Sequence, residues 1–382
     1  MRFFHLSDLH IGARLINRDL REDQEFVFDQ IVDLARLHKP DAVVIAGDIY
    51  DRAIPSAESA ELFDTFISSL ACAVPEAEIM LVSGNHDSAQ RLNTFRSILA
   101  RQRLHMIGLP PSQPGEHLEK VTLTDEYGTV CFYLLPFVKP SMIKQIVGTD
   151  PNGANLSYNA SVCALLDREE LDSSVRNVLV SHQFYLPAGG SADAVERMDS
   201  ETVTVGNIDS VSGEILRRFD YSALGHIHKP MLVNGENCRY CGTPLAYSVS
   251  EAEQEKGVVM VDLKEKGVVE TTVLPLTPLR RVRVIRGELA EVLGQGCGDY
   301  VTVILTDKAD LDVIDMQDRL RFAFPCLLEI RRETIRAADY SAPLAPETER
   351  DPFELCAMFL KDMDEGEQEL LRDVINTVME VG

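Results

Sequence analysis

The stretch DAVVIAGDIYDR, residues 41–52, joins a short apolar run to a glycine and then to an aspartate. The β-branched run at 41–47 has the length of a buried strand and stops at Gly47. Asp48 follows at once, so a carboxylate lies just beyond the expected strand end. In α/β folds this edge of the sheet is where ligands bind. The stretch therefore predicts a buried strand that delivers a functional side chain.

The same arrangement recurs four more times, and the runs alternate with amphipathic helices expected at 22–37 and 58–71. Such alternation predicts an α/β fold with a largely parallel or mixed sheet that is covered by helices on both faces. Each further run leads into polar side chains of metal-ligand type: MRFFHLS (1–7) into Asp8 and His10, EIMLVSG (78–84) into Asn85, His86 and Asp87, NVLVSH (177–182) into His182, and YSALG (221–225) into His226 and His228.

Seven of these side chains form a candidate metal-binding set that contains no cysteine: Asp8, His10, Asp48, Asn85, His182, His226 and His228. Carboxylate and imidazole ligands together suit manganese, iron or zinc. Seven ligands are too many for one tetrahedral ion, and they suit two ions about 3.5–4 Å apart that share a carboxylate and a water. Gly47, Gly84 and Gly225 each precede a candidate ligand, and we expect them to allow sharp turns there.

Composition excludes several classes of protein. The chain has 382 residues, of which 45% are hydrophobic and 26% charged, as in a globular protein of about two or three domains. No apolar run reaches the roughly 18 residues of a membrane span, and the N-terminus lacks the pattern of a signal peptide. Eight scattered cysteines fit a reducing compartment, with only Cys238 and Cys241 spaced for zinc or redox use. We therefore expect a cytoplasmic protein.

The charge pattern bears on nucleic-acid binding. A net charge of −24 argues against binding DNA through bulk charge alone. Arginines nevertheless cluster at 280–286 and 330–336. Such clusters are either solvated strand faces or phosphate contacts, and the sequence leaves both open.

The pattern of expected strands and helices changes after residue 275. Strands expected at 282–287, 300–305 and 326–332, with a helix at 311–324, predict a small α+β domain over 276–340. A Pro-rich acidic linker is expected at 341–350. Residues 351–382 read as two short helices with wide apolar faces, which either dock on another surface or pack back on their own domain.

The motifs SDLHIG, GDIYDR, SGNHDS, VSHQF and ALGHIHKP resemble those of the calcineurin-like metallophosphoesterases. More closely, they resemble the Mre11 family of nucleases, which includes the bacterial SbcD subunits. The resemblance covers essentially the whole chain and is most specific over 1–275. It implies an α/β fold in which a β-sandwich is flanked by helices in four αββα layers, with a capping domain at 276–340 and a C-terminal helical hairpin at 351–382. It also places Cys238 and Cys241 in an ordinary structural segment.

The resemblance assigns roles to the candidate residues. Manganese would be the metal, with Asp48 bridging two ions. His86 would be the catalytic histidine, and Asp87 is placed to orient it. Archaeal and eukaryotic relatives have a histidine shortly after the bridging aspartate; it has no counterpart here, and Asp51 is left outside the active site. Asp8, His10 and His228 would hold one ion, and Asn85, His182 and His226 the other.

The leading functional hypothesis is a manganese-dependent nuclease that cuts double-stranded DNA ends and hairpins, as endonuclease and 3′–5′ exonuclease, in repair, recombination and replication. The resemblance implies an SMC-like ATPase partner of the SbcC/Rad50 type, docked on the C-terminal helices, and a cytoplasmic, nucleoid-associated location. It also implies a homodimer within a heterotetramer, formed through helices near 54–71 or 89–103. The alternatives are a bimetal phosphodiesterase or phosphatase for a small substrate, and a non-catalytic scaffold.

Overall fold

The computed structural model describes residues 1–187, 189–190, 195–201, 209–307, 313–333, 366–368 and 370–371. The chain divides into two compact units, Met1–Glu333 and Thr334–Gly382. Nearly all of the description concerns the first unit.

The first unit contains two six-stranded sheets. One has the strand order β16-β15-β1-β4-β5-β6, in which β1, β4, β5 and β6 run parallel and β15 and β16 are antiparallel additions at one edge. The bounds of its strands are β1 Arg2–Leu6, β4 Ala42–Ala46, β5 Glu78–Val82, β6 Leu104–Ile107, β15 Gly257–Leu263 and β16 Val269–Pro275.

The other six-stranded sheet has the order β13-β14-β12-β9-β8-β7. Its four central strands run parallel, and an antiparallel strand closes each edge. The bounds are β7 Glu119–Asp125, β8 Gly128–Leu135, β9 Arg176–His182, β12 Tyr221–Gly225, β13 Met231–Leu232 and β14 Cys238–Tyr240.

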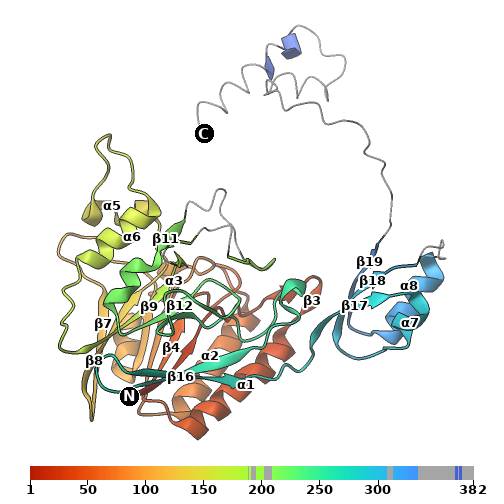
Figure 1. Ribbon diagram of the computed structural model, residues 1–382, viewed down its shortest axis with the longest axis horizontal. Coiled ribbons are helices and arrows are strands. Elements are labelled where there is room, and N and C mark those ends of the chain that lie inside the picture. Colours follow the sequence, from red (N-terminus) through yellow and green to blue (C-terminus); the bar gives the residue numbers. More distant parts are fainter. Residues whose placement is uncertain are drawn as a thin grey trace. The chain divides into compact units, whose positions relative to one another are not determined.

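Helices cover the outer face of each sheet (Figure 1). Helices α1 (Arg21–His38) and α2 (Ala57–Ala73) pack on the first sheet, and α5 (Pro140–Val147) and α6 (Tyr158–Asp167) pack on the second. Serine caps begin two of them, because Ser56 accepts a hydrogen bond from Ser59 N and Ser157 accepts one from Ala160 N.

A third apolar cluster lies between the two sheets and includes Phe3, Val44, Phe132, Val180 and Ala223. The layers are therefore helix, sheet, sheet and helix, which confirms the four-layer α/β sandwich. The residue pattern alone suggested one sheet covered on both faces by helices. A strand buried on both faces reads the same whether its second face meets a helix or another sheet, so periodicity could not separate the two architectures.

All five ligand-bearing strands end at the same edge of the sandwich. Strands β1, β4 and β5 are adjacent and parallel in the first sheet. Strands β9 and β12 are adjacent and parallel in the second. Because the two sheets face each other, the polar residues that follow these strands meet between the layers.

The glycines before the ligands act in two ways. Gly47 has φ +90°, a left-handed backbone conformation that favours glycine, as expected for a sharp turn. Gly225 is different, because its φ is not positive and its role is close approach: a Cβ built there would overlap the carbonyl oxygen of Ala46 in the opposite sheet. The two sheets thus approach each other closely through backbone beside the candidate ligands.

Residues after 275 form a separate three-stranded parallel sheet with its own apolar cluster. Its elements are β17 Val282–Gly287, α7 Leu289–Leu293, β18 Tyr300–Leu305, α8 Val313–Ala323 and β19 Leu327–Arg332 (Figure 1). The expected strands and helix are present, and α7 is an additional short helix. This α+β part belongs to the same compact unit as the sandwich, and a domain boundary at 275 remains a prediction.

Specific polar contacts hold the α+β part against the sandwich. Arg280 pairs with Glu22 at 2.6 Å and with Asp23 at 2.9 Å, and Tyr300 donates a hydrogen bond to Asp23 at 2.7 Å. On another side, Arg18 donates to the carbonyls of Pro325 and Leu327. Arg18 lies in a small hairpin of β2 (Arg14–Leu15) and β3 (Arg18–Asp19), which therefore connects the ligand edge of the sandwich to β19.

The remaining short elements connect these layers. They are α3 Ala89–Leu92, α4 Arg96–Leu99, β10 Phe184–Leu186, β11 Ser210–Ser212 and the 3-10 helices Ala100–Gln102, Gly213–Arg218 and Val249–Glu251. The predicted linker at 341–350 and most of the predicted hairpin at 351–382 lie outside the described residues, although residues 366–368 and 370–371 are helical. Among the described helices, none is both long and apolar enough to cross a membrane.

Gly225→Ala should destabilise the metal-free protein by about 1–3 kcal/mol, because the added methyl group forces the two sheets apart. The measurement is the free energy of unfolding in urea. Gly298→Ala is the matched control, since a Cβ at Gly298 meets no atom within 4 Å. Equal unfolding free energies for the two variants would show that the sheets do not meet as closely as described.

Candidate metal centre

The structure brings all seven candidate ligands together at the edge where the two sheets meet. Asp8, His10, Asp48 and Asn85 come from loops of the first sheet, whereas His182, His226 and His228 come from the second. Three overlapping groups of donor atoms lie within 4.8 Å of one another: Asp8–His10–His228, Asp8–Asp48–His182 and His10–Asp48–His86. Each group draws on residues that are far apart in the sequence.

One end of the site is formed by His10, His228 and Asp8. The Nε2 atoms of His10 and His228 are 3.1 Å apart, and Oδ1 of Asp8 lies 4.0 and 3.9 Å from them. Ser200 donates to Glu251 at 2.6 Å and so accepts the Nδ1–H of His228 at 2.7 Å. This fixes the tautomer of His228 and turns the lone pair of its Nε2 toward His10.

The other end is formed by Asn85, His182 and His226. Oδ1 of Asn85 lies 3.0 Å from Nε2 of His182 and 2.9 Å from Nδ1 of His226. Nδ1 of His182 donates to the carbonyl of Ala46 at 2.7 Å, which leaves Nε2 as the ring atom that faces the site.

Asp48 lies between the two ends. Its Oδ2 is 3.6 Å from Nε2 of His10 and 3.3 Å from Nε2 of His182, while Oδ1 accepts a hydrogen bond from His86 N at 2.9 Å. One carboxylate oxygen thus faces donors at both ends.

The electrostatics of the metal-free site fit cation binding. Burial lowers the pKa of His10 and of His226 far below the ordinary value, so both rings are neutral and can offer lone pairs. Burial also opposes protonation of His182, but the carboxylate of Asp48 raises the pKa of that histidine to about 9. In the metal-free protein a proton on His182 therefore compensates the negative charge of Asp48. The two side chains meet where the lone pairs of the candidate ligands converge. The donor set and this trapped positive charge fit a site for two divalent ions.

The ligand loops carry backbone strain. Asp8, His10, Asp48 and His226 have φ of 53°, 42°, 48° and 106°, in a region that side chains rarely adopt. Hydrogen bonds from the backbone of His226 to both carboxylate oxygens of Asp8, each 3.1 Å, help to hold one such turn. Strain of this kind clusters at functional sites, where the surrounding structure maintains it.

His86 lies beside the ligands, with its ring 4.8 Å from that of His10. The expectation that Asp87 orients His86 is wrong. The ring Nδ1 of His86 donates to the carbonyl of Asp51 at 2.9 Å, so the segment left outside the site supplies the orienting atom.

Asp87 has a different role. Its carboxylate accepts backbone hydrogen bonds from Gly84, Ile49 and Tyr50, at 2.8, 3.0 and 2.9 Å. It therefore ties the loop after β5 to the loop after β4. The position of Asp87 next to His86 in the sequence predicts a contact between their side chains. The carboxylate of Asp87 instead accepts hydrogen bonds from the backbone of the two loops.

Residues 195–201 were not predicted from the sequence, and they contact both histidines of the GHIH turn at 225–228. Glu201 accepts the backbone N–H of His228 at 2.8 Å and pairs with Arg197. Nη2 of Arg197 lies 3.3 Å from Nε2 of His226, and its guanidinium covers the ring of Phe184. No strand ends here, so the pattern that identified the ligands could not find this segment.

A second missed group lies in the segment 243–256. Glu251 is fully buried and pairs with Lys256 at 2.7 Å, and the hydroxyl of Thr243 donates to the same carboxylate at 2.9 Å. Tyr247 donates to the carbonyl of Leu9. Cys238 and Cys241 do not form a common metal or redox site, because their side chains lie on opposite faces of the second sheet. Cys238 belongs to the outer apolar cluster and Cys241 to the cluster between the sheets.

The α+β part contributes to the surroundings of the ligands. A cavity of about 440 Å³ is lined by His10 and His228 and also by Glu329 and Arg331 of β19. Most arginines of the two predicted clusters are already paired within the protein: Arg280 with Glu22, Arg283 with Asp299, Arg286 with Glu333 and Arg331 with Glu329. The interpretation of these clusters as free phosphate contacts is therefore weakened.

Comparisons with known proteins identify the family. Residues 1–230 match the model of the calcineurin-like phosphoesterases. The SbcD subunit of the nuclease SbcCD from Staphylococcus epidermidis is 30% identical over 293 residues, which are 77% of this chain and 74% of that protein. A dimetal phosphatase from Danio rerio is 14% identical, with a TM-score of 0.38 over 72% of this chain and 99% of that chain. A protein of Thermus thermophilus is 12% identical, with a TM-score of 0.38 over 71% and 98%.

Metal affinity should rise with pH between pH 7 and 9, by up to about tenfold per unit and less steeply near pH 9, because an ion bound at His182 would displace one proton. The raised pKa of His182 also means that protonation of this ring stabilises the metal-free fold. This stabilisation is fully present below about pH 6.5 and is lost as the pH rises to about 9. Titration calorimetry in buffers of different ionisation enthalpy measures the protons released. Equal affinity across this range would contradict the ion pair of His182 and Asp48.

Glu201→Gln should weaken metal binding by about 10- to 100-fold, because the neutral amide holds Arg197 and the backbone of His228 less firmly. The dissociation constant for manganese measures this effect, and the melting temperature of the metal-free protein separates it from unfolding. Glu196→Gln is the control, since Glu196 is exposed and pairs only with Lys229 among the described residues. Equal affinities for the two variants would exclude the positioning role of residues 195–201.

Proposed function

The chain belongs to the calcineurin-like phosphoesterase family, and from this premise we propose that it is a manganese-dependent DNA nuclease subunit. The observation that carries the proposal is the convergence of seven carboxylate, imidazole and amide ligands from five strand ends. We assign Asp8, His10 and His228 to one ion, Asn85, His182 and His226 to the other, and Asp48 to both. The distances across each group and the central position of Asp48 support this division.

A phosphodiester carries a negative charge that repels an attacking hydroxide. Two divalent ions in this site would offset that charge and lower the pKa of water. The chain's own contribution is to hold the ligands in neutral or anionic form and to keep their geometry fixed. Asn85 adds an oxygen ligand without a further full charge.

His86 is the proposed catalytic histidine. Its Nδ1–H donates to the carbonyl of Asp51, which fixes the orientation of the ring. The ring borders His10 and Asp48, where a phosphate on the ions would lie. From there it can donate a proton to the leaving oxygen or stabilise the charge of the transition state. Asp87 supports this arrangement through the loop backbone rather than through His86 itself.

DNA is the proposed substrate, in the form of double-stranded ends and hairpins cut by endonuclease and 3′–5′ exonuclease activity in repair, recombination and replication. The similarity to the SbcD subunit of a nuclease supports this class of substrate. So does the position of β19, whose Glu329 and Arg331 line a cavity with His10 and His228. A small phosphate ester would not need a neighbouring domain to complete its binding site.

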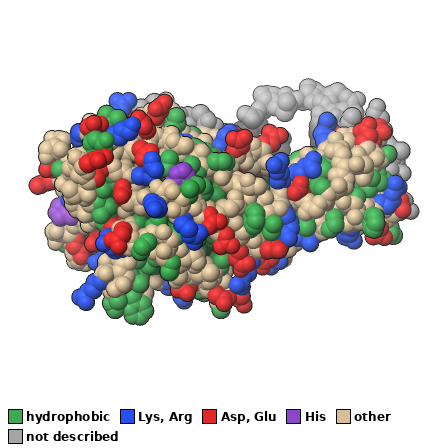
Figure 2. Space-filling view, turned by 90° about the horizontal axis from the view of Figure 1, so that it is seen from below, with side chains coloured by type: hydrophobic (Ala, Val, Ile, Leu, Met, Phe, Trp, Pro, Cys, Tyr) green, Lys and Arg blue, Asp and Glu red, His purple; other side chains and the backbone are tan. Residues whose placement is uncertain are grey.

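An SMC-like ATPase of the SbcC/Rad50 type is the proposed partner, within a heterotetramer. The charge distribution supports the need for a partner. Figure 2 shows acidic and basic side chains interspersed over the face that it presents, and the net charge is −24. A protein with this surface gains little from counterion release, so another subunit would supply most of the phosphate contacts.

We also propose that two copies of the chain associate, and that the complex works in the cytoplasm on the nucleoid. Exposed Phe95 and Ile98 support an interface around 89–103, because large apolar side chains on a surface often mark contacts between proteins. The C-terminal residues 351–382 are the proposed docking segment for the ATPase.

His86→Ala should lower kcat on hairpin and end-blocked DNA with manganese by about 10²- to 10⁴-fold, while the affinity for manganese stays within a few-fold. Single-turnover cleavage is measured with and without the ATPase partner. His105→Ala is the control, because His105 pairs with Glu78 away from the site. Hydrolysis of a chromogenic diester without any cleavage of DNA would favour the small-substrate alternative.

A further inference from the structure

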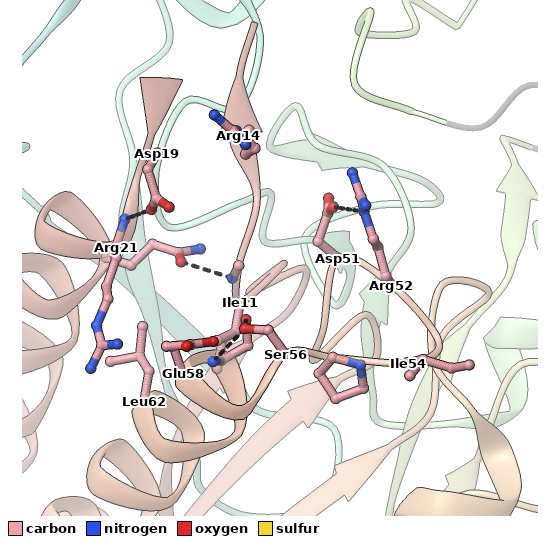
Figure 3. A pocket seen from close by; sticks show the side chains of 14 residues that line it. Ile11, Arg14, Asp19, Arg21, Asp51, Arg52, Ile54, Ser56, Glu58 and Leu62 are labelled. Carbon is pink, nitrogen blue, oxygen red and sulfur yellow. Dashed lines mark hydrogen bonds and ion pairs between the residues drawn. The ribbon is translucent and has the colours of Figure 1, made fainter. Parts of the chain in front are cut away.

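A second cavity of about 590 Å³ adjoins the proposed metal site (Figure 3). It shares Arg14 and Asp51 with the cavity that contains His10 and His228, so the two lie side by side. Oδ1 of Asp51 is 4.0 Å from Nδ1 of His10. A group bound in this second cavity would therefore lie next to a phosphate held on the ions.

The basic side chains around the second cavity are not equivalent. Arg21 pairs with Glu25 at 2.8 Å and with Glu61 at 3.2 Å, and Arg52 pairs with Asp51 at 3.5 Å. Arg14 is exposed and donates to the carbonyl of Asn17. Within the described ranges no carboxylate lies within 4 Å of its guanidinium, which leaves its charge available to an anion at the boundary of the two cavities.

The interior of the cavity suits a neutral group rather than a phosphate. Asp19 and Glu58 line it together with apolar Ile54 and Leu62. Figure 3 shows Ile54, Ser56 and Leu62 on the lower side of the view and Arg14 above them. Carboxylates repel a phosphate but accept hydrogen bonds from the exocyclic amines of bases. Ile54 is 73% exposed, and a flat base packed on it would remove that apolar surface from water.

We propose that this cavity receives the base of the nucleotide next to the scissile bond, with Arg14 on the neighbouring phosphate. This inference rests on the proposed nuclease function and specifies the substrate further. A base in the cavity cannot remain in a duplex, so the site would act on a nucleotide that is unpaired or pulled out of the stack. Frayed ends and hairpin loops supply such nucleotides.

Arg14→Gln and Ile54→Ser test the two halves of the proposal. Arg14→Gln should lower kcat/KM for single-stranded DNA about tenfold more than kcat/KM for a chromogenic diester that has no flanking phosphate. It should also reduce the salt slope of DNA binding, measured by fluorescence anisotropy without metal, by about one unit. Arg36→Gln is the control, since Arg36 pairs with Asp33 on α1.

The base contact is tested with oligonucleotides in which a single abasic residue is moved across the cleaved bond. At one position the missing base should lower the wild-type kcat/KM about tenfold, because apolar contact and hydrogen bonds are lost. Ile54→Ser should reduce this discrimination. Leu37→Ser should retain it, as Leu37 is 72% exposed on α1. Size-exclusion chromatography verifies that each variant keeps the wild-type oligomeric state.

The outcomes separate this inference from the proposed function. If the wild type cleaves DNA but ignores every abasic position, or if both variants match it, the base pocket is wrong while the nuclease remains. If the wild type hydrolyses the chromogenic diester but neither binds nor cleaves DNA, the nuclease function is wrong and this inference with it.

Discussion

The mutual repulsion of lone pairs and carboxylates at one buried edge is the constraint on which the structure depends. Asp8 and Asp48 are almost fully buried, and imidazole nitrogens approach each other to 3.1 Å. Such a cluster is costly unless positive charge enters it. Strained turns, a buried Glu251–Lys256 pair and the carboxylates of Asp87 and Glu201 all serve to keep these groups in place. Much of the sandwich near this edge is thus organised around groups that would otherwise separate.

The ligands could be predicted from the sequence because strand ends and polar residues follow one another along the chain. Asp8, Asp48, Asn85, His182 and His226 all lie within three residues of a strand's last residue. The supporting residues could not be predicted in this way. Arg197, Ser200 and Glu251 reach the site through tertiary packing, and Asp87 binds backbone that local patterns do not reveal. The number of sheets was ambiguous for the same reason. A strand that is buried on both faces has the same apolar pattern whether a helix or a second sheet packs on it.

The arginine clusters illustrate how a charge pattern misleads when its partners are distant. Arg280 and Glu22 are 258 residues apart, yet their side chains meet at 2.6 Å. The arginine cluster is visible in the sequence, but the distant carboxylate that pairs with it is not. Arg14 lies in no cluster, but no described carboxylate neutralises it and it borders both cavities. Availability of charge therefore depends on tertiary pairing rather than on local density.

The backbone contact between Gly225 and Ala46 acts as a mechanical stop between the two layers. It limits how far one sheet can slide over the other. Since both layers contribute to each proposed ion site, the spacing of two bound ions would be set by rigid layers and only secondarily by loops. Loops on the far edge can lengthen, shorten or acquire new binding segments while this spacing is preserved. The fold thereby separates the part that must stay fixed from the parts that are free to diversify.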